Sequence, residues 1–127
     1  MTDFVNKVDL YNQTSTINVD TLETETSITA EIDTSSSTSP HDLLTPSSGK
    51  RISTRGYLIT TDSTGGEIAI KFADSGVIVG KLYASRHGRV GMYGIHLNGD
   101  VDEKVQVEWS GLSSGAKIFV IVTYKEK

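Results

Sequence analysis

Apolar and polar residues alternate over short stretches along most of this chain, with the period of two that is typical of β-strands. In residues 67–72, for example, Ile68, Ile70 and Phe72 are separated by small or polar residues and would share one face of a strand. No stretch keeps a helical period beyond a single turn. The pattern predicts strands over residues 27–33, 51–61, 67–72, 77–84, 89–97, 104–109 and 117–126.

The stretch 117–126 is the strand around which we expect the others to assemble. Its apolar run, Ile118 to Val122, is rich in β-branched and aromatic residues, is too short for a helix and has polar residues on both sides. It is predicted to be the central strand of a sandwich, covered on both faces. Gly56 interrupts the stretch 51–61 and predicts a bulge. The Gly-containing turn that follows predicts a hairpin between 51–61 and 67–72.

Turns recur at the spacing of an all-β fold, so the predicted fold class is all-β, an antiparallel β-sandwich. Residues 34–42 read as a polar loop, after which Leu43 and Leu44 are predicted to plug one end of the sandwich. Residues 1–26 combine polar and acidic residues with scattered apolar ones, and could not fold alone. We therefore expect an N-terminal arm over 1–26 and a β-sandwich domain over 27–127.

Composition narrows the class of protein. A chain of 127 residues is expected to form one domain with one core. It has no cysteine, which excludes disulfides, thiolate metal sites and a catalytic cysteine. No apolar run is long enough to span a bilayer, and the first residues lack the features of a secretion signal. We expect a soluble protein that is made in a cytoplasm and has no membrane partner.

Charge is distributed unevenly along the chain. Residues 1–42 contain eight acidic residues and one lysine, a net charge of −7, whereas residues 43–127 contain eleven basic and eight acidic residues, a net charge of +3. Such an asymmetry can guide assembly between subunits or with a partner, although a solvated acidic arm explains it equally well. The chain is not basic enough to predict binding to nucleic acid.

The arm is the first candidate binding element. Its apolar residues would have to be buried on the domain or on another protein for the arm to become ordered. The predicted partner-binding residues of the arm are Phe4, Val5, Val8, Leu10 and Tyr11.

Catalytic and metal-binding motifs are missing from the sequence. The three histidines have no ligand spacing, and the acidic turn at Asp100, Asp102 and Glu103 lacks the longer loop of a dedicated calcium site. No serine lies in the strained Gly-x-Ser-x-Gly turn of a nucleophile. We therefore predict that the protein is not an enzyme and has no cofactor and no metal.

Two sets of surface residues remain as binding candidates. Trp109 and Tyr93 could stack on a sugar, while the other tyrosines lie beside apolar runs and are assigned to the core or an interface. A basic face between subunits is the second candidate, with a solvated basic face as the alternative. Its predicted members are Arg51, Arg55, Arg86 and Arg89.

Four segments resemble sequences of small structural proteins of tailed bacteriophages. They are Leu43–Ile52 (LLTPSSGKRI), Leu82–Ala84 (LYA), Gly99–Glu103 (GDVDE) and Val122–Glu126 (VTYKE). The resemblance implies a jelly-roll-like virion protein, of the capsid-decoration or head- or tail-fibre type, commonly trimeric. Residues 1–42 match nothing in that family, so the resemblance does not indicate what the arm would bind.

The sequence thus predicts a non-enzymatic phage virion structural protein, made in the host cytoplasm and located in the virion. It would decorate or attach to a capsid or tail surface through its arm, bind a major capsid or tail protein, and self-associate through the sandwich as a homotrimer. The alternative is a carbohydrate-binding module that recognises a host-surface glycan through Trp109 and Tyr93.

Overall fold

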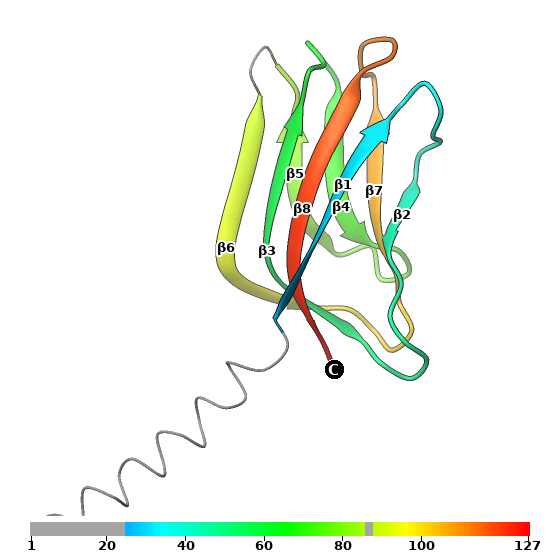
Figure 1. Ribbon diagram of the computed structural model, residues 1–127, viewed down its shortest axis with the longest axis vertical. Coiled ribbons are helices and arrows are strands. Elements are labelled where there is room, and N and C mark those ends of the chain that lie inside the picture. The colour runs from blue at the N-terminus through cyan, green and yellow to red at the C-terminus, as the bar shows by residue number, and fades with distance from the viewer. Residues whose placement is uncertain (1–24, 86–87) are drawn as a thin grey trace, which may run out of the picture.

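The computed structural model describes residues 25–85 and 88–127, and this part of the chain is all-β (Figure 1). Two four-stranded antiparallel sheets face each other, with strand orders β1-β8-β3-β6 and β2-β7-β4-β5. The strands are β1 (Thr26–Asp33), β2 (His41–Leu44), β3 (Ile52–Thr61), β4 (Glu67–Phe72), β5 (Ile78–Tyr83), β6 (Arg89–Asn98), β7 (Val105–Ser110) and β8 (Lys117–Glu126).

The pairing of the strands follows a simple rule. β1 pairs with β8, β2 with β7, β3 with β6 and β4 with β5, all antiparallel. The chain is therefore one long hairpin whose first half runs back along its second half. Rolling this hairpin adds the pairs β3–β8 and β4–β7 and produces the two sheets. An eight-stranded double sheet of this kind is a jelly roll, which confirms the predicted sandwich.

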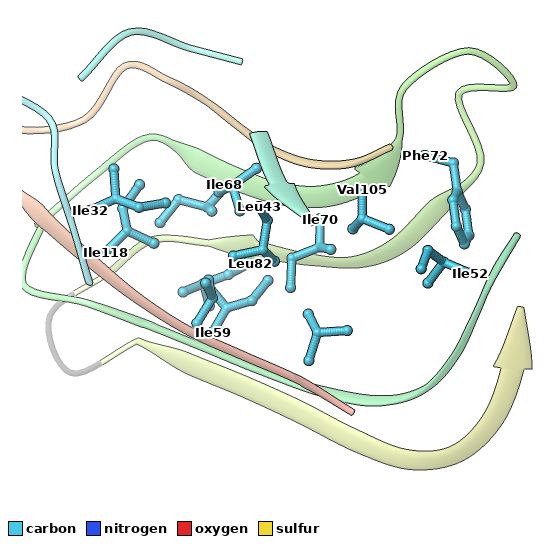
Figure 2. Packing of buried hydrophobic residues seen from close by; sticks show 13 residues of the cluster. Ile32, Leu43, Ile52, Ile59, Ile68, Ile70, Phe72, Leu82, Val105 and Ile118 are labelled. Atoms are coloured by element: carbon cyan, nitrogen blue, oxygen red, sulfur yellow. The ribbon is translucent and has the colours of Figure 1, made fainter. Parts of the chain in front are cut away.

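The core lies between the two sheets and consists of aliphatic residues with one phenylalanine (Figure 2). Ile59 of β3 and Val120 of β8 approach it from one sheet, and Ile68 and Ile70 of β4 from the other; all four are fully buried. Complete burial of each such side chain contributes about 1.5–3 kcal/mol. Because inward residues alternate with outward ones, each sheet also presents an outer face.

Strand β8 is central, as predicted, since it lies between β1 and β3. The prediction that both of its faces are covered is wrong. Ile118, Val120 and Val122 are fully buried against the opposite sheet, but Phe119 points outward and is 38% exposed. A continuous apolar run therefore does not require two covered faces in this strand. Instead, it leaves apolar side chains on the outer face of the sheet.

Two further predictions need correction. Strands β3 and β4 do not form a hairpin, because the turn after Thr61 carries the chain from one sheet to the other. Leu43 and Leu44 do not lie in an end loop but belong to β2, where Leu43 joins the core at 8% exposure. The predicted bulge at Gly56 is confirmed, since the register of β3 shifts between Thr54 and Gly56 against both of its neighbours.

Candidate functional site

A buried carboxylate fastens the loops at one end of the sandwich. Glu103 is fully buried and accepts hydrogen bonds from the backbone N–H groups of Asp74 (2.6 Å), Asp100 (2.8 Å) and Ser75. The Ser75 hydroxyl donates to the same carboxylate at 3.2 Å. Burial by itself raises the pKa of Glu103, but the backbone and hydroxyl donors outweigh burial and hold the pKa below its ordinary value. Glu103 is therefore a charged acceptor that links two loops.

Two more carboxylates at this end of the sandwich also accept hydrogen bonds from backbone N–H groups of a loop. Asp102 accepts the N–H of Gly49 at 2.7 Å, and Glu126 accepts the N–H of Ser47. Backbone hydrogen bonds in both directions join Arg51 to Lys127. Among the residues that the structure describes, no group of three His, Cys, Asp or Glu side chains could hold a metal ion. The acidic turn at 100–103 is thus a structural element of the jelly roll.

These bonds explain most of the resemblance to phage structural proteins. Three of the four matching segments meet at this one end, where segment 43–52 hydrogen-bonds both to 99–103 and to 122–126. The fourth segment, 82–84, lies apart at the end of β5. The matching residues therefore hold the fold together, and they describe its loops without identifying a binding surface.

The outer face of the β2-β7-β4-β5 sheet is covered by ion pairs. Lys71 pairs with Glu108, and Lys81 lies 3.5 Å from Glu67. A hollow of about 220 Å³ on this face is lined by these four side chains together with Trp109. Exposed ion pairs of this kind contribute little to stability and are compatible with a face in contact with water.

The outer face of the β1-β8-β3-β6 sheet is more apolar. Phe119 and Ile121 of β8 lie beside Thr60 and Leu58 of β3, and all four point away from the core. The ring of Tyr93 crosses this face, because a Cβ on Gly56 would come within 2.7 Å of its Cδ1 atom.

The hydroxyl group of Tyr93 reaches toward the start of β1. It donates a 2.5 Å hydrogen bond to the carboxylate of Glu25, just before that strand. This hydrogen bond raises the pKa of Tyr93 above its ordinary value. Tyr93 as a whole remains 69% exposed, so the outer face offers both apolar and aromatic contact area.

Exposed hydrophobic side chains gather along β5 and β6, which are the edge strands on one side of the sandwich. Of the eight large hydrophobic residues that are exposed within 25–85 and 88–127, six lie on or directly beside these two strands. They are Val77, Ile78, Tyr83, Met92, Tyr93 and Ile95, with exposed fractions from 40% to 70%. Concentrated apolar surface of this kind is typical of a protein-binding site.

The predicted arm residues Phe4 to Tyr11 lie outside the described residues.

The predicted basic face is described only in part, because Arg86 also lies outside the described residues. Arg51 lies in the loop before β3, next to the C-terminus. Arg55 is 9% exposed, with its Nη1 atom 3.3 Å from Nδ1 of His96. Arg89 begins β6 and pairs with Thr60, at the far end of β3 from Arg51 and Arg55. The described arginines therefore do not form a single cluster.

The two glycan candidates also lie apart. Trp109 is in β7, is half-buried and packs against the core, whereas Tyr93 is in β6 of the other sheet. They therefore do not form a common stacking platform. Trp109 lines two hollows, the one with the ion pairs and one formed by residues 34–35 and 109–115.

Sequence reasoning missed the apolar side at β5 and β6. The sequence did contain a signal for this surface. Residues 77–98 have three basic and no acidic residues, and they include Val77, Met92 and Ile95, which the predicted core does not need. The same pattern is compatible with buried strands, and only the position of β5 and β6 at the sheet edges distinguishes the two cases.

The fold and the surface thus define a jelly-roll β-sandwich with an apolar edge. No protein-family model matches the sequence, and no curated protein matches it. Among solved structures, the chain is similar to the cryo-EM structure of the giant freshwater prawn Macrobrachium rosenbergii extra small virus (XSV) VLP. The TM-score is 0.37 and the sequence identity 11%, over 79% of this chain and 75% of that chain. A likeness this distant does not bear on function.

Proposed function

We propose that this protein is a non-enzymatic structural protein of a virion, which acts by binding other proteins. The observation that supports the proposal most strongly is the side formed by β5 and β6, where six large hydrophobic side chains are exposed. An exposed side chain that packs against another protein contributes through the apolar area it removes from water. Jelly rolls form viral capsid domains, and the same architecture also serves lectins and cupins.

In this proposal the two parts of the chain have different partners. The sandwich self-associates as a homotrimer. The arm, residues 1–26, attaches the trimer to a major capsid or tail protein by burying Phe4, Val5, Val8, Leu10 and Tyr11. The net charge of −7 over residues 1–42 orients the arm, while apolar burial supplies most of the affinity. The protein is made in the host cytoplasm and incorporated into the virion.

Binding to particles tests the proposal. The full chain and a variant lacking residues 1–24 are each mixed with virions or empty capsids and sedimented, and the pellets are compared by electron microscopy. The full chain should sediment with the particles at regular positions, and the truncated variant should remain in the supernatant while keeping the circular dichroism spectrum of a β-sandwich. Equal binding by both would contradict the role of the arm, and binding by neither would contradict a virion role.

A carbohydrate-binding function is the second candidate, favoured by the position of Trp109 beside two hollows. A glycan array probed with the full chain and with Trp109→Ala tests it. Binding that depends on Trp109 would support this function, and the absence of any glycan signal at high protein concentration would leave the virion role as the proposal.

A further inference from the structure

We infer that copies of this chain associate side by side, with the β6 edge of one copy pairing with the β1 edge of the next. The inference rests on the self-association proposed above, and it adds the surface, the partner and the geometry. The partner is a second copy of this chain. β6 and β1 are the two edge strands of the β1-β8-β3-β6 sheet, and β5 and β2 are the edge strands of the other sheet (Figure 1).

The two edges of the β1-β8-β3-β6 sheet differ in the charges they leave without an ion pair. Residues 25–33, which include β1, contain three acidic residues, Glu25, Glu31 and Asp33, and no lysine or arginine. Residues 89–98, which form β6, contain Arg89 and no acidic residue. One side of a copy therefore attracts the opposite side of another copy and repels its own equivalent. This complementarity favours a head-to-tail contact over a two-fold symmetric one.

The directions of the strands also fit such a contact. Neighbouring strands of the β1-β8-β3-β6 sheet are all antiparallel, so the four directions alternate and the two edge strands run in opposite directions. A second copy placed beside the first by rotation about an axis along the strands presents its β1 antiparallel to β6. The two sheets can then continue as one, with ladder hydrogen bonds across the contact.

In the β1-β8-β3-β6 sheet, one row of paired residues has a charged residue at each of its two ends. Across the outer face, Glu31 of β1 pairs with Phe119, Phe119 with Thr60, and Thr60 with Arg89 of β6. When the row continues into the next copy, Arg89 comes to lie opposite Glu31 of that copy. Cross-strand neighbours of opposite charge stabilise a sheet. Both residues are available, because the ion pairs within 25–85 and 88–127 are Lys71–Glu108, Lys81–Glu67 and Lys104–Asp42.

The same register brings apolar residues together on the inner side. Three positions after Arg89 in β6, Met92 belongs to the row that contains Tyr57, Val122 and Ile28. Continuing this row puts Met92, which is 47% exposed, against the half-buried Ile28 of the next copy. Val90 likewise comes opposite Ala30. The contact therefore buries apolar area that a single copy leaves in water.

The two stretches that would pair carry none of the usual protection, since the irregular pairing of β6 falls after Tyr93. Soluble proteins guard edge strands with proline, inward-pointing charges or bulges. The segments Arg89–Tyr93 and Ser27–Glu31 contain no proline, and their inward positions hold Val90, Met92, Ile28 and Ala30. Both segments also pair without register shifts with the strands behind them, so that each presents a regular edge.

Charge reversal tests the predicted pair. The dissociation constant of the full-chain assembly is measured by sedimentation velocity for Arg89→Glu, for Glu31→Arg and for the double variant. Each single reversal should weaken association about tenfold or more, and the double reversal should restore it. Lys117→Glu is the matched control, since it makes the same charge change on central β8 and should have little effect. Single variants that associate like the wild type, or a double variant as weak as the singles, would overturn the pairing.

Cysteine cross-linking tests the head-to-tail geometry, and the chain is suited to it because it has no cysteine of its own. Ile28→Cys in β1 and Met92→Cys in β6, which share one row and one face of the proposed joined sheet, are treated with a short bis-maleimide, separately and as a mixture. The mixture should give covalent dimers, and neither variant should cross-link with itself. Self-linkage of Met92→Cys would overturn the inference while leaving self-association intact. A wild-type chain that stays monomeric, with no cross-links in any sample, would contradict both the inference and the self-association proposed above.

Discussion

The backbone N–H of Gly49 donates a 2.7 Å hydrogen bond to Oδ1 of Asp102 and so joins two turns that are 53 residues apart in the sequence. Both residues have a positive φ, +79° for Gly49 and 65° for Asp102. Among the described residues, Asp102 is the only residue other than glycine that has a positive φ. In this way the strained turn at residues 99–103 is held against the Thr45–Arg51 loop, next to the buried carboxylate of Glu103.

Substitutions at Asp102 should separate the hydrogen bond from the backbone conformation. Asp102→Ala should lower the free energy of unfolding by about 1–2 kcal/mol. The substitution removes the hydrogen-bond acceptor and leaves at positive φ a residue that has a Cβ atom but no polar side chain. Asp102→Gly should cost less, since glycine tolerates this φ, and Asp102→Asn should be nearly neutral. Urea denaturation followed by tryptophan fluorescence measures the series. An Asp102→Ala variant as stable as Asp102→Asn would contradict this account of the turn.

Glu103 should contribute more to stability than any of the exposed ion pairs. Glu103→Gln should destabilise the protein by about 2–3 kcal/mol, because the amide NH₂ group would face N–H donors in a buried site. Ser75→Ala is the matched control, which removes a single donor to the same carboxylate and should cost about 1 kcal/mol. Chemical denaturation compares the two. Equal effects of both substitutions would mean that the backbone N–H groups do not depend on Glu103.

The stability of the protein should fall in acid. The pKa of Glu103 in the folded protein lies below its ordinary value of 4.5, so the unfolded chain binds the proton more readily than the folded chain. The stabilisation is therefore complete above the unfolded pKa and is lost as the pH falls through the lower, folded pKa. Glu126 acts in the same direction, because the N–H of Ser47 holds its pKa down.

Thermal unfolding at a series of pH values measures this dependence. The wild type should lose stability below the ordinary pKa of glutamate, and Glu103→Gln should show a shallower loss over the same interval. A variant whose stability falls as steeply with acid as that of the wild type would show that Glu103 is not the titrating group.

A close contact between the sheets gives a further prediction. A Cβ on Gly80 of β5 would lie 2.2 Å from Cζ of Tyr57 in β3, so Gly80→Ala should force the two sheets apart and cost about 2–3 kcal/mol. Gly65→Ala is the matched control, because nothing lies within 4 Å of its Cβ position. Thermal melts of the two variants provide the comparison. Gly80→Ala with a melting temperature like that of Gly65→Ala would contradict the inter-sheet contact.

The sequence predicted most strands because each has a period-2 pattern and a turn at each end, as in Glu67–Phe72. It missed β2, because four residues beginning with His41 and Asp42 are too few to show a period. It also paired β3 with β4 because their connection is short. In fact the residues that decide the partner of a strand are far away in sequence, as Ile59 and Val120 show.

The surface was harder to predict than the core. A period-2 pattern identifies which residues share a face, but not whether another protein or another sheet covers that face. Phe119 and Met92 could each have been core residues on the basis of sequence alone. The burial of Ile118 and Val120 shows that Phe119 lies on an outer face, and the strand order shows that Met92 lies on an edge strand.

The oligomeric state of the full chain tests the central claim most directly, since the account assigns this jelly roll to binding its own copies. Mass photometry and sedimentation velocity from nanomolar to micromolar concentrations measure it. The account predicts a discrete assembly, expected to be a trimer of the 13.7 kDa chain, which dissociates on dilution and in high salt. A monomer across the whole concentration range, at low and high salt alike, would contradict it.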